Sequence, residues 1–228
     1  MPPTLMHRVQ LKRAFDFTFA FLGLLAVLPL MIVIATAVWA RDRGPVLIAQ
    51  ERVGWRRRTF RMLKFRTMVV HAERVTGPTW SWAGDPRVTR VGRILRATHL
   101  DELPQLWNVL LGEMSFVGPR PERALFVERL EQVIPGYTNR LAIRPGITGL
   151  SQLRNGYDES LRTVRRKIRY DLLYVRRGCA LLDAMILVDT GLSMVGLSGG
   201  LALRKVAVHA TPPRWPSAAV RSLGSRPW

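Results

Sequence analysis

A long uncharged run near the N-terminus constrains this chain more than any other feature. From Phe17 to Ala40 the sequence reads FTFAFLGLLAVLPLMIVIATAVWA, without a charged residue. As a straight helix this run would be about 36 Å long, enough to cross a hydrocarbon core of roughly 30 Å. It is longer than the apolar part of a secretory signal peptide, so we expect it to be retained. The segment therefore predicts a protein that is associated with a membrane.

The residues leave two arrangements of this segment open. A single span would place the larger basic flank, and with it the rest of the chain, in the cytoplasm. A re-entrant helix would instead bend near Pro29, because proline removes one helical hydrogen bond in the middle of the run. Basic residues stand on both sides of the run, which suits two ends that lie on the same anionic membrane face.

Composition narrows the class of protein. The chain has 228 residues, of which 48% are hydrophobic, and this excludes disorder throughout. Cys179 is the only cysteine, which excludes an internal disulfide framework and a cysteine-based zinc site. The net charge of +19 calls for an anionic partner: a membrane surface, a phosphorylated substrate or nucleic acid. Because the basic residues do not alternate with stacking aromatic residues, we expect no nucleic-acid partner.

The pattern after the apolar run predicts a mostly helical α+β fold. Two β-prone stretches, 46–49 and 59–66, flank a polar turn at 54–58 and indicate a small β-hairpin. Helical spacing of apolar residues predicts amphipathic helices that lie along the membrane or the domain. These helices cover 88–95, 100–110, 121–132, 158–177 and 181–197, with turns at 135–136 and 145–146. Residues 205–228 have the composition of a disordered tail.

An adjacent acid pair, Asp101-Glu102, is the strongest candidate for chemistry. One interpretation is local: Thr98 would cap a helix, Asp101 would complete a capping box, and Pro104 would lie in the first turn. The other interpretation is catalytic. An aspartate carboxylate can attack phosphorus, and a neighbouring glutamate oxygen suits Mg²⁺.

Several basic residues stand in conformationally restricted contexts. Lys64 and Arg66 belong to the β-prone stretch, Arg120 lies between two prolines, and Arg144 precedes a Pro-Gly pair. A flanking proline lowers the entropy cost of holding the backbone in place. The guanidinium group of arginine also matches the geometry of phosphate oxygens. Together these residues indicate a phosphate-binding site.

Five ordered motifs carry a resemblance to a known family. They are KFRTM at 64–68, DPRVTRVGRILR at 85–96, LDELPQLWNVLLGEMSFVGPRPE at 100–122, RPGITGL at 144–150 and YDLLYV at 170–175. With these motifs the chain resembles the bacterial sugar transferases, the monotopic phosphoglycosyl transferases that act on polyprenyl phosphate. The resemblance runs from about Lys12 to about Val195. It suggests the minimal form of the family, without the additional N-terminal spans of larger relatives.

The resemblance implies a reaction and a set of site residues. A UDP-sugar would donate a sugar phosphate to a polyprenyl phosphate such as undecaprenyl phosphate, giving UMP and a polyprenyl diphosphosugar. This is the initiating step of exopolysaccharide, capsule or O-antigen synthesis. Asp101 would be the nucleophile that forms a covalent intermediate, and Glu102 would bind Mg²⁺. The residues expected to bind substrate are Lys64, Arg66, Arg120, Arg144, Arg154 and Asp171.

The resemblance also implies an architecture. A re-entrant helix over 14–40, broken at Pro29, would enter the inner membrane from the cytoplasmic face, behind a basic segment at 1–13. A catalytic domain over 41–204 would carry the hairpin and interfacial helices. Expected partners are the UDP-sugar, polyprenyl phosphate and membrane lipids, and a homo-oligomer is left open. The alternative function is a membrane-anchored basic binding or scaffold protein without catalysis. No motif identifies the sugar.

Overall fold

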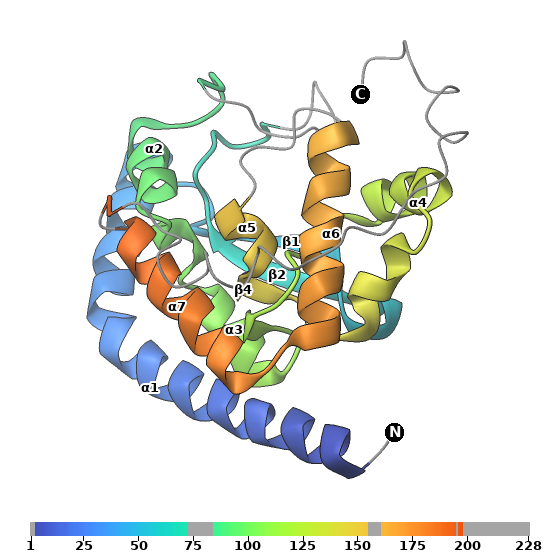
Figure 1. Cartoon of the computed structure of the whole chain (residues 1–228). Helices are drawn as coiled ribbons and strands as arrows, with labels where there is room; N and C mark the ends of the chain where they lie inside the picture. The colour runs from blue at the N-terminus through green and yellow to red at the C-terminus, as the bar shows by residue number, and fades with distance from the viewer. Residues whose placement is uncertain (1–2, 73–83, 155–160, 195, 198–228) are drawn as a thin grey trace.

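The computed structural model describes residues 3–72, 84–154, 161–194 and 196–197 (Figure 1). The α-helices are α1 (Pro3–Asp42), α2 (Arg90–Ala97), α3 (Gln105–Leu111), α4 (Ala124–Val133), α5 (Leu150–Arg154), α6 (Leu161–Arg177) and α7 (Ala180–Met194). The strands are β1 (Leu47–Val53), β2 (Thr59–Phe65), β3 (Ser115–Val117) and β4 (Gly146–Thr148). Three 3-10 turns are η1 (Trp55–Arg57), η2 (Leu100–Glu102) and η3 (Tyr137–Ala142). The expected tail at 205–228 lies outside the described residues.

The apolar run forms most of α1, which remains helical through Pro29. The expected break is therefore not an interruption of the helix. Figure 1 shows instead that α1 changes direction along its length. A proline inside a helix removes one backbone hydrogen bond and favours such a bend without ending the helix. The helix also begins earlier than expected, at Pro3, so the basic N-terminal segment is helical too.

The parts of α1 before and after Pro29, its first and second arms, both pack on the body formed by the rest of the protein. In the first arm, Ala20 is fully buried in a cluster with Val109 and Met114. In the second arm, Val38 is buried in a cluster with Phe65 and Leu95. The helix therefore lies along the rest of the protein, as Figure 1 shows.

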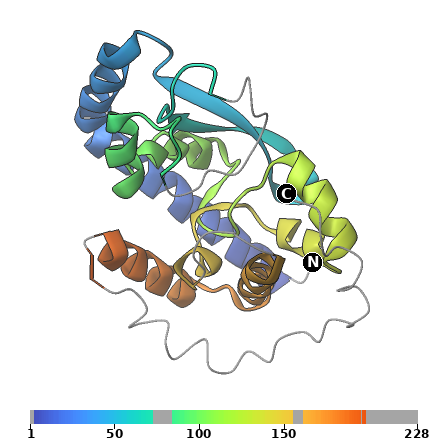
Figure 2. The ribbon, with the colours of Figure 1, turned by 90° about the horizontal axis from the view of Figure 1, so that it is seen from above.

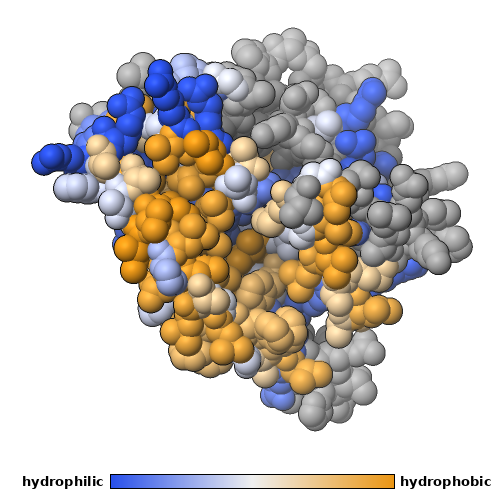
Figure 3. Space-filling model, turned by 90° about the vertical axis from the view of Figure 1, so that its left-hand side faces the viewer, coloured by the Kyte–Doolittle hydropathy of each residue, from blue (hydrophilic) through white to orange (hydrophobic). Residues whose placement is uncertain are grey.

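The other side of α1 exposes a broad apolar surface, visible in Figure 3. Its large exposed residues are Leu11, Phe15, Phe17, Phe19, Phe21, Leu22, Leu25, Leu28, Leu30, Ile32, Val33 and Trp39. By length and composition, Gln10–Asp42 is also sufficient to cross a membrane. An apolar surface of this extent marks a membrane or partner interface.

The expected β-hairpin is confirmed. β1 and β2 pair antiparallel, from Leu47 opposite Phe65 to Val53 opposite Thr59. Figure 2 shows the hairpin extending from the end of α1 towards α4. Two arginines at its tip, Arg56 and Arg57, adopt left-handed backbone conformations.

A second, parallel pair of strands was not expected. Ser115 of β3 pairs with Gly146 of β4, so the predicted turn at 145–146 is wrong and this position instead begins a strand. The pairing depends on glycine. A Cβ on Gly146 would lie 2.1 Å from the backbone nitrogen of Gly118, which no side chain could tolerate. This close approach fixes the end of β3, from which the loop carrying Arg120 begins.

The remaining helices close the core. The predicted helices near 88–95, 121–132, 158–177 and 181–197 correspond to α2, α4, α6 and α7. One apolar cluster joins α4, η3 and α6 through Val127, Tyr137 and Ile168. Another joins β3, α5 and α7 through Val117 and Ile186. Around the acid pair, η2 contacts α2 and β2, and α3, which follows it, packs on α1.

Candidate active site

The acid pair lies in a short 3-10 turn between α2 and α3. His99 enters this turn in a left-handed conformation with φ of 56°, and the turn itself is Leu100–Glu102. Thr98 ends α2, and its hydroxyl donates to the carbonyl of Ile94 at 2.8 Å. The local capping interpretation of Asp101 is therefore wrong, because Thr98 caps the preceding helix. The conformation of the turn leaves the carboxyl group of Asp101 available for other contacts.

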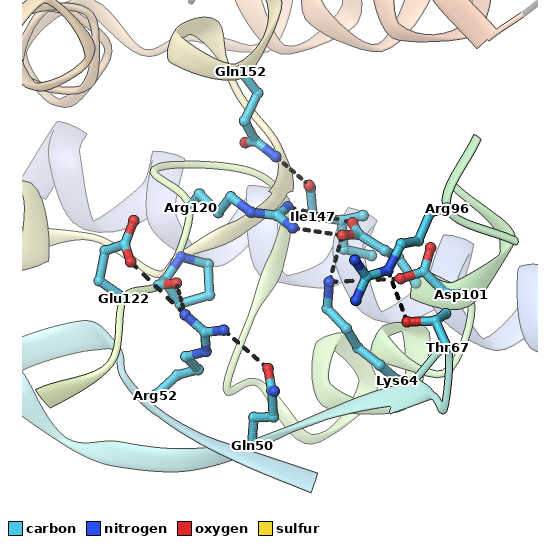
Figure 4. A network of polar contacts seen from close by, with 12 residues as sticks. Gln50, Arg52, Lys64, Thr67, Arg96, Asp101, Arg120, Glu122, Ile147 and Gln152 are labelled. Carbon is cyan, nitrogen blue, oxygen red and sulfur yellow. Dashed lines mark hydrogen bonds and ion pairs between the residues drawn. The ribbon is translucent and has the colours of Figure 1, made fainter. Parts of the chain in front are cut away.

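Two cations from distant parts of the chain converge on this pair (Figure 4). Asp101 is 7% exposed and Glu102 is 9% exposed. Lys64, from the end of β2, donates from Nζ to Oε1 of Glu102 at 2.7 Å. Arg120, from the loop after β3, donates from Nη2 to the same oxygen at 2.6 Å and from Nη1 to Oε2 at 3.4 Å. The sequence separations show that only the fold could assemble this cluster.

The two carboxyl groups differ in their electrostatic compensation. Burial opposes the ionised form of Glu102, but Arg120 and Lys64 outweigh burial and hold its pKa well below the usual range. Asp101 lies farther from Lys64, with 3.9 Å between Nζ and Oδ2. Burial therefore prevails and raises the pKa of Asp101 above its usual value of 3.8. Glu102 is a neutralised anion, whereas Asp101 is the more basic of the two carboxylates.

Arg96, to which the sequence patterns assigned no role, lies beside Asp101. Its Nε donates to the hydroxyl of Thr67 at 2.8 Å, and Figure 4 shows both near Asp101. Its charge acts with those of Lys64 and Arg120 to lower the pKa of Asp101. Arg96 belongs to the motif at 85–96, and its place near the end of the helix before the acid pair was a usable signal.

Two predicted substrate-binding residues lie in other surroundings. Arg66 is buried and pairs with Asp42 at the end of α1. The Nε atom of Arg144 donates to the carbonyl of Gly112 at 2.8 Å, and its guanidinium lies 4.7 Å from the ring centroid of Trp55. In the described contacts these arginines hold the ends of α1 and α3. Their roles towards a substrate stay predictions.

Helix α5 carries a third predicted residue, Arg154. Its Nε and Nη2 atoms are buried and have no hydrogen-bond partner among the described residues. On the same helix, Gln152 donates from Nε2 to the carbonyl of Ile147 at 2.8 Å, close to Arg120 in Figure 4. Unsatisfied guanidinium donors suit an anion that arrives from outside the chain.

Asp171 lies in the interior, behind the site. It is 2% exposed and accepts a hydrogen bond from Nε of Arg140 at 2.8 Å. Its contacts in the described part of the chain are therefore those of an internal ion pair. Pro29, the remaining predicted residue, lies within the apolar run of α1.

The fold and the site define a membrane-associated protein with a buried acid pair, one member held by two cations. The family model for bacterial sugar transferases matches residues 7–196. The chain therefore belongs to the bacterial sugar transferase family. This confirms the resemblance inferred from the five motifs.

Individual relatives support the same assignment. The chain is 40% identical over 180 residues to a UDP-N-acetylgalactosamine-undecaprenyl-phosphate N-acetylgalactosaminephosphotransferase of Aeromonas hydrophila, covering 79% of this chain and 42% of that protein. It is 42% identical over 190 residues to a UDP-glucose:undecaprenyl-phosphate glucose-1-phosphate transferase of Xanthomonas campestris pv. campestris, covering 82% and 39%. An exopolysaccharide production protein of Rhizobium leguminosarum bv. phaseoli is 40% identical over 189 residues, covering 80% and 94%. The chain thus spans about two fifths of the first two relatives.

Proposed function

We propose that this protein transfers a sugar-1-phosphate from a UDP-sugar to a polyprenyl phosphate, as the initiating step of a surface or exported polysaccharide. The observation that carries the proposal is that nearby cations compensate the two acids to different degrees. Glu102 is neutralised by Lys64 and Arg120, and Asp101 is a less compensated, buried carboxylate beside them. Two of the relatives are named for UDP-N-acetylgalactosamine or UDP-glucose and for undecaprenyl phosphate, which supports the same two substrate classes here.

The reaction proceeds in two displacements at one phosphorus atom. An Asp101 oxygen attacks the phosphorus that bears the sugar, a new O–P bond forms, and the bond to UMP breaks. The acceptor's phosphate oxygen then attacks the same phosphorus, and the bond to Asp101 breaks. The product is a polyprenyl diphosphosugar, and the carboxylate is regenerated. Lys64 and Arg120 balance the phosphate charge in both steps. A covalent intermediate lets a soluble donor and a lipid acceptor use one site in turn.

We also propose Mg²⁺ as the cofactor, with Glu102 as its protein ligand. Among the described residues, the short contacts of Lys64 and Arg120 both end on Oε1, while Oε2 receives only the 3.4 Å contact. Oε2 is therefore the oxygen best placed for a hard cation. Nowhere in the described ranges do three His, Cys, Asp or Glu side chains gather, so donor phosphate oxygens and water would complete the shell. When bound, Mg²⁺ neutralises diphosphate charge.

The proposed location is the cytoplasmic face of the inner membrane, with α1 as a re-entrant helix. Support comes from the packing of both α1 arms on one body, which a straight span could not maintain. Other elements also expose large apolar side chains, including Trp107 and Leu111 on α3. The UDP-sugar donor is a cytoplasmic metabolite class, so the acid pair should face that side.

A lipid-free incubation tests the chemistry. The purified protein, incubated with Mg²⁺ and either UDP-glucose or UDP-N-acetylgalactosamine, should release about one equivalent of UMP. Mass spectrometry should find a sugar phosphate on the peptide that contains Asp101. Asp101→Asn should abolish both signals, and EDTA should suppress them.

The matched control is Asp85→Asn, which alters a buried aspartate that pairs with Arg87. This variant should retain UMP release. A binding or scaffold protein would release no UMP with either donor. Turnover by Asp101→Asn at the wild-type rate would overturn the assignment, and full activity in EDTA would remove Mg²⁺.

A further inference from the structure

The loop that presents Arg120 is held at its backbone by groups from distant elements. The carbonyl of Pro119 accepts a hydrogen bond from the amide of Gly146 at 3.0 Å. The carbonyl of Glu122 accepts one from the amide of Val53 at 2.8 Å. These two contacts fix the ends of the loop, at β4 and at β1. Between them, Nη1 of Arg52 reaches the carbonyl of Pro121 at 3.4 Å, and the carbonyl of Arg120 at the loop centre has a different partner.

A buried arginine holds that centre. Nη2 of Arg140 donates to the backbone carbonyl of Arg120 at 2.7 Å. Arg140 comes from η3 and is 1% exposed, so its contact with the loop is made inside the protein. It makes no hydrogen bond or ion pair to the acid pair within the described ranges. Its influence on the site must therefore pass through Arg120.

Arg140 is itself fixed on every side. Nε donates to Oδ2 of Asp171 at 2.8 Å, and Nη2 lies 2.7 Å from the same oxygen. Nη1 donates to the hydroxyl of Tyr137 at 3.1 Å. Asp171 belongs to α6 and is 2% exposed. A chain of contacts thus runs from Asp171 on α6, through Arg140, to the backbone carbonyl of Arg120. The side chain of Arg120 continues it to Glu102.

Stability alone explains such an arrangement poorly. Burying two charges has a desolvation cost that mutual attraction only partly offsets, and apolar residues of similar volume often serve stability equally well. The planar guanidinium offers something apolar residues lack: several directional donors that link a carboxylate, a phenol and a backbone carbonyl. The pair therefore supplies orientation at the loop centre.

We propose that Arg140 and Asp171 are positioning residues for the transfer reaction, acting through the backbone of Arg120. The inference rests on the proposed function and deepens it by assigning Asp171 an indirect role instead of substrate contact. Displacement of Arg120 by about 1 Å would reduce its hold on Glu102 and on the donor phosphates, and misplacement of this size costs about a hundredfold in rate.

The central variant is Arg140→Lys, measured by single-turnover release of UMP from UDP-glucose or UDP-N-acetylgalactosamine. Lysine keeps the positive charge beside Asp171, but it lacks the guanidinium donors that bind the carbonyl of Arg120 at the same time. We expect the rate to fall about tenfold to a hundredfold. Asp171→Asn keeps the side-chain shape and should lower the rate in the same direction. It serves as the second variant should Arg140→Lys fail to fold.

A double-mutant cycle separates positioning from general damage. In an Arg120→Ala background, Arg140→Lys should change the residual rate by less than about twofold, because the group it positions is gone. If the two substitutions damaged the structure independently, their effects on the rate would multiply instead. Ile168→Ala is the matched control: Ile168 is 1% exposed and belongs to the same core cluster as Tyr137, whose hydroxyl accepts a hydrogen bond from Arg140. It should lower the unfolding temperature while leaving the rate of folded protein within about twofold.

The outcomes distinguish this inference from the proposed function. UMP release by wild type is read first, since no release with either donor would overturn the proposed function and this inference with it. Wild-type release together with an unimpaired Arg140→Lys would overturn the positioning role only. The positioning role is also overturned if the effects multiply in the cycle, or if Ile168→Ala loses rate equally.

Discussion

At the scale of single residues, Lys64 opposes the effect of burial on the protonation of Asp101, the proposed nucleophile. Burial raises the pKa of Asp101 above 3.8, and among the nearby charges Lys64 lowers it most. Because the nucleophile must be deprotonated, the rate should fall as pH drops through this raised pKa. Lys64→Met removes the opposing charge, so the acid limb of the rate profile should move to higher pH. Initial UMP release measured across pH checks this.

Arg96→Gln is the graded control for this experiment. Arg96 also lowers the pKa of Asp101, but less than Lys64 does. Its removal should move the acid limb in the same direction by a smaller amount. An acid limb that stays in place, or moves to lower pH, in Lys64→Met would contradict the electrostatic account of the acid pair.

Also at the scale of single residues, the ionisation of Glu122 makes the free energy of unfolding depend on pH. Burial would raise its pKa, but Lys167, Arg140 and Arg52 outweigh burial and lower the pKa from 4.5 to about 2. A lowered folded pKa contributes stability that is complete above about pH 4.5 and is lost as pH falls towards 2. The contribution is roughly 3 kcal/mol of unfolding free energy.

Denaturant unfolding of detergent-solubilised protein measures this contribution. Glu122→Gln should lose roughly 3 kcal/mol at pH 7, and its deficit relative to wild type should shrink towards pH 2. Glu131→Gln alters an exposed pair with Arg57 and should cost less than about 1 kcal/mol. A deficit that is equal at pH 7 and pH 2 would show that the loss does not arise from ionisation of Glu122.

At the scale of elements, α2 depends on a glycine for its closeness to the segment that follows β2. A Cβ on Gly92 would lie 2.0 Å from the carbonyl oxygen of Thr67. Alanine has the better helix propensity by about 1 kcal/mol, but a backbone clash of this size exceeds that gain. Gly92→Ala should lower the unfolding free energy by about 1–3 kcal/mol. It should also slow UMP release, because Arg96 would move away from Asp101.

The matched control is Gly191→Ala in α7, where an added Cβ would meet nothing within 4 Å. This variant should be neutral or more stable by up to about 1 kcal/mol, with an unchanged rate. Thermal unfolding and single-turnover assays of both variants give the comparison. Wild-type stability in Gly92→Ala would mean that α2 does not rest on Thr67.

Local patterns in the sequence were sufficient for α1, α2, α4, α6, α7 and the hairpin, since periodicity and turn residues lie within each element. They did not predict α5, and the helix expected over 100–110 is divided into η2 and α3. They were insufficient for β3 and β4. Each of these strands is three residues long, too short to show alternation, and their pairing joins Ser115 to Gly146. The turn at the acid pair was missed for a related reason. His99 adopts a left-handed conformation that its residue type does not signal.

The candidate site also combines residues that local patterns predict with contacts that only the fold determines. Asp101, Glu102, Lys64 and Arg120 were named from the sequence, and the structure brings them together. Arg66 and Arg144 carry the same charge in equally restricted contexts, so no local pattern separates them. What separates them is distant: the partner of Arg66 is Asp42, at the end of α1.

At the scale of the whole molecule, the packing of α1 predicts its topology. Ala20 and Val38 lie on opposite sides of Pro29 in the chain, yet both are buried against one body. A straight membrane span would carry one of them away from the body. The exposed apolar surface of α1 between Ala20 and Val38 must still be buried away from water. A helix that enters and leaves on one face meets both conditions.

Cysteine labelling in a Cys179→Ser background tests this topology. Gln10→Cys and Arg41→Cys place exposed thiols on the two arms, and Leu28→Cys places one in the apolar run. An impermeant maleimide should label both arms in inverted inner-membrane vesicles and neither arm in spheroplasts, while the thiol at position 28 stays unlabelled in both. Labelling of the two arms from opposite sides would establish a single span. Pro29→Ala restores the hydrogen bond that favours a straight helix. It should therefore shift labelling of the Gln10→Cys arm towards spheroplasts and weaken the packing of either Ala20 or Val38.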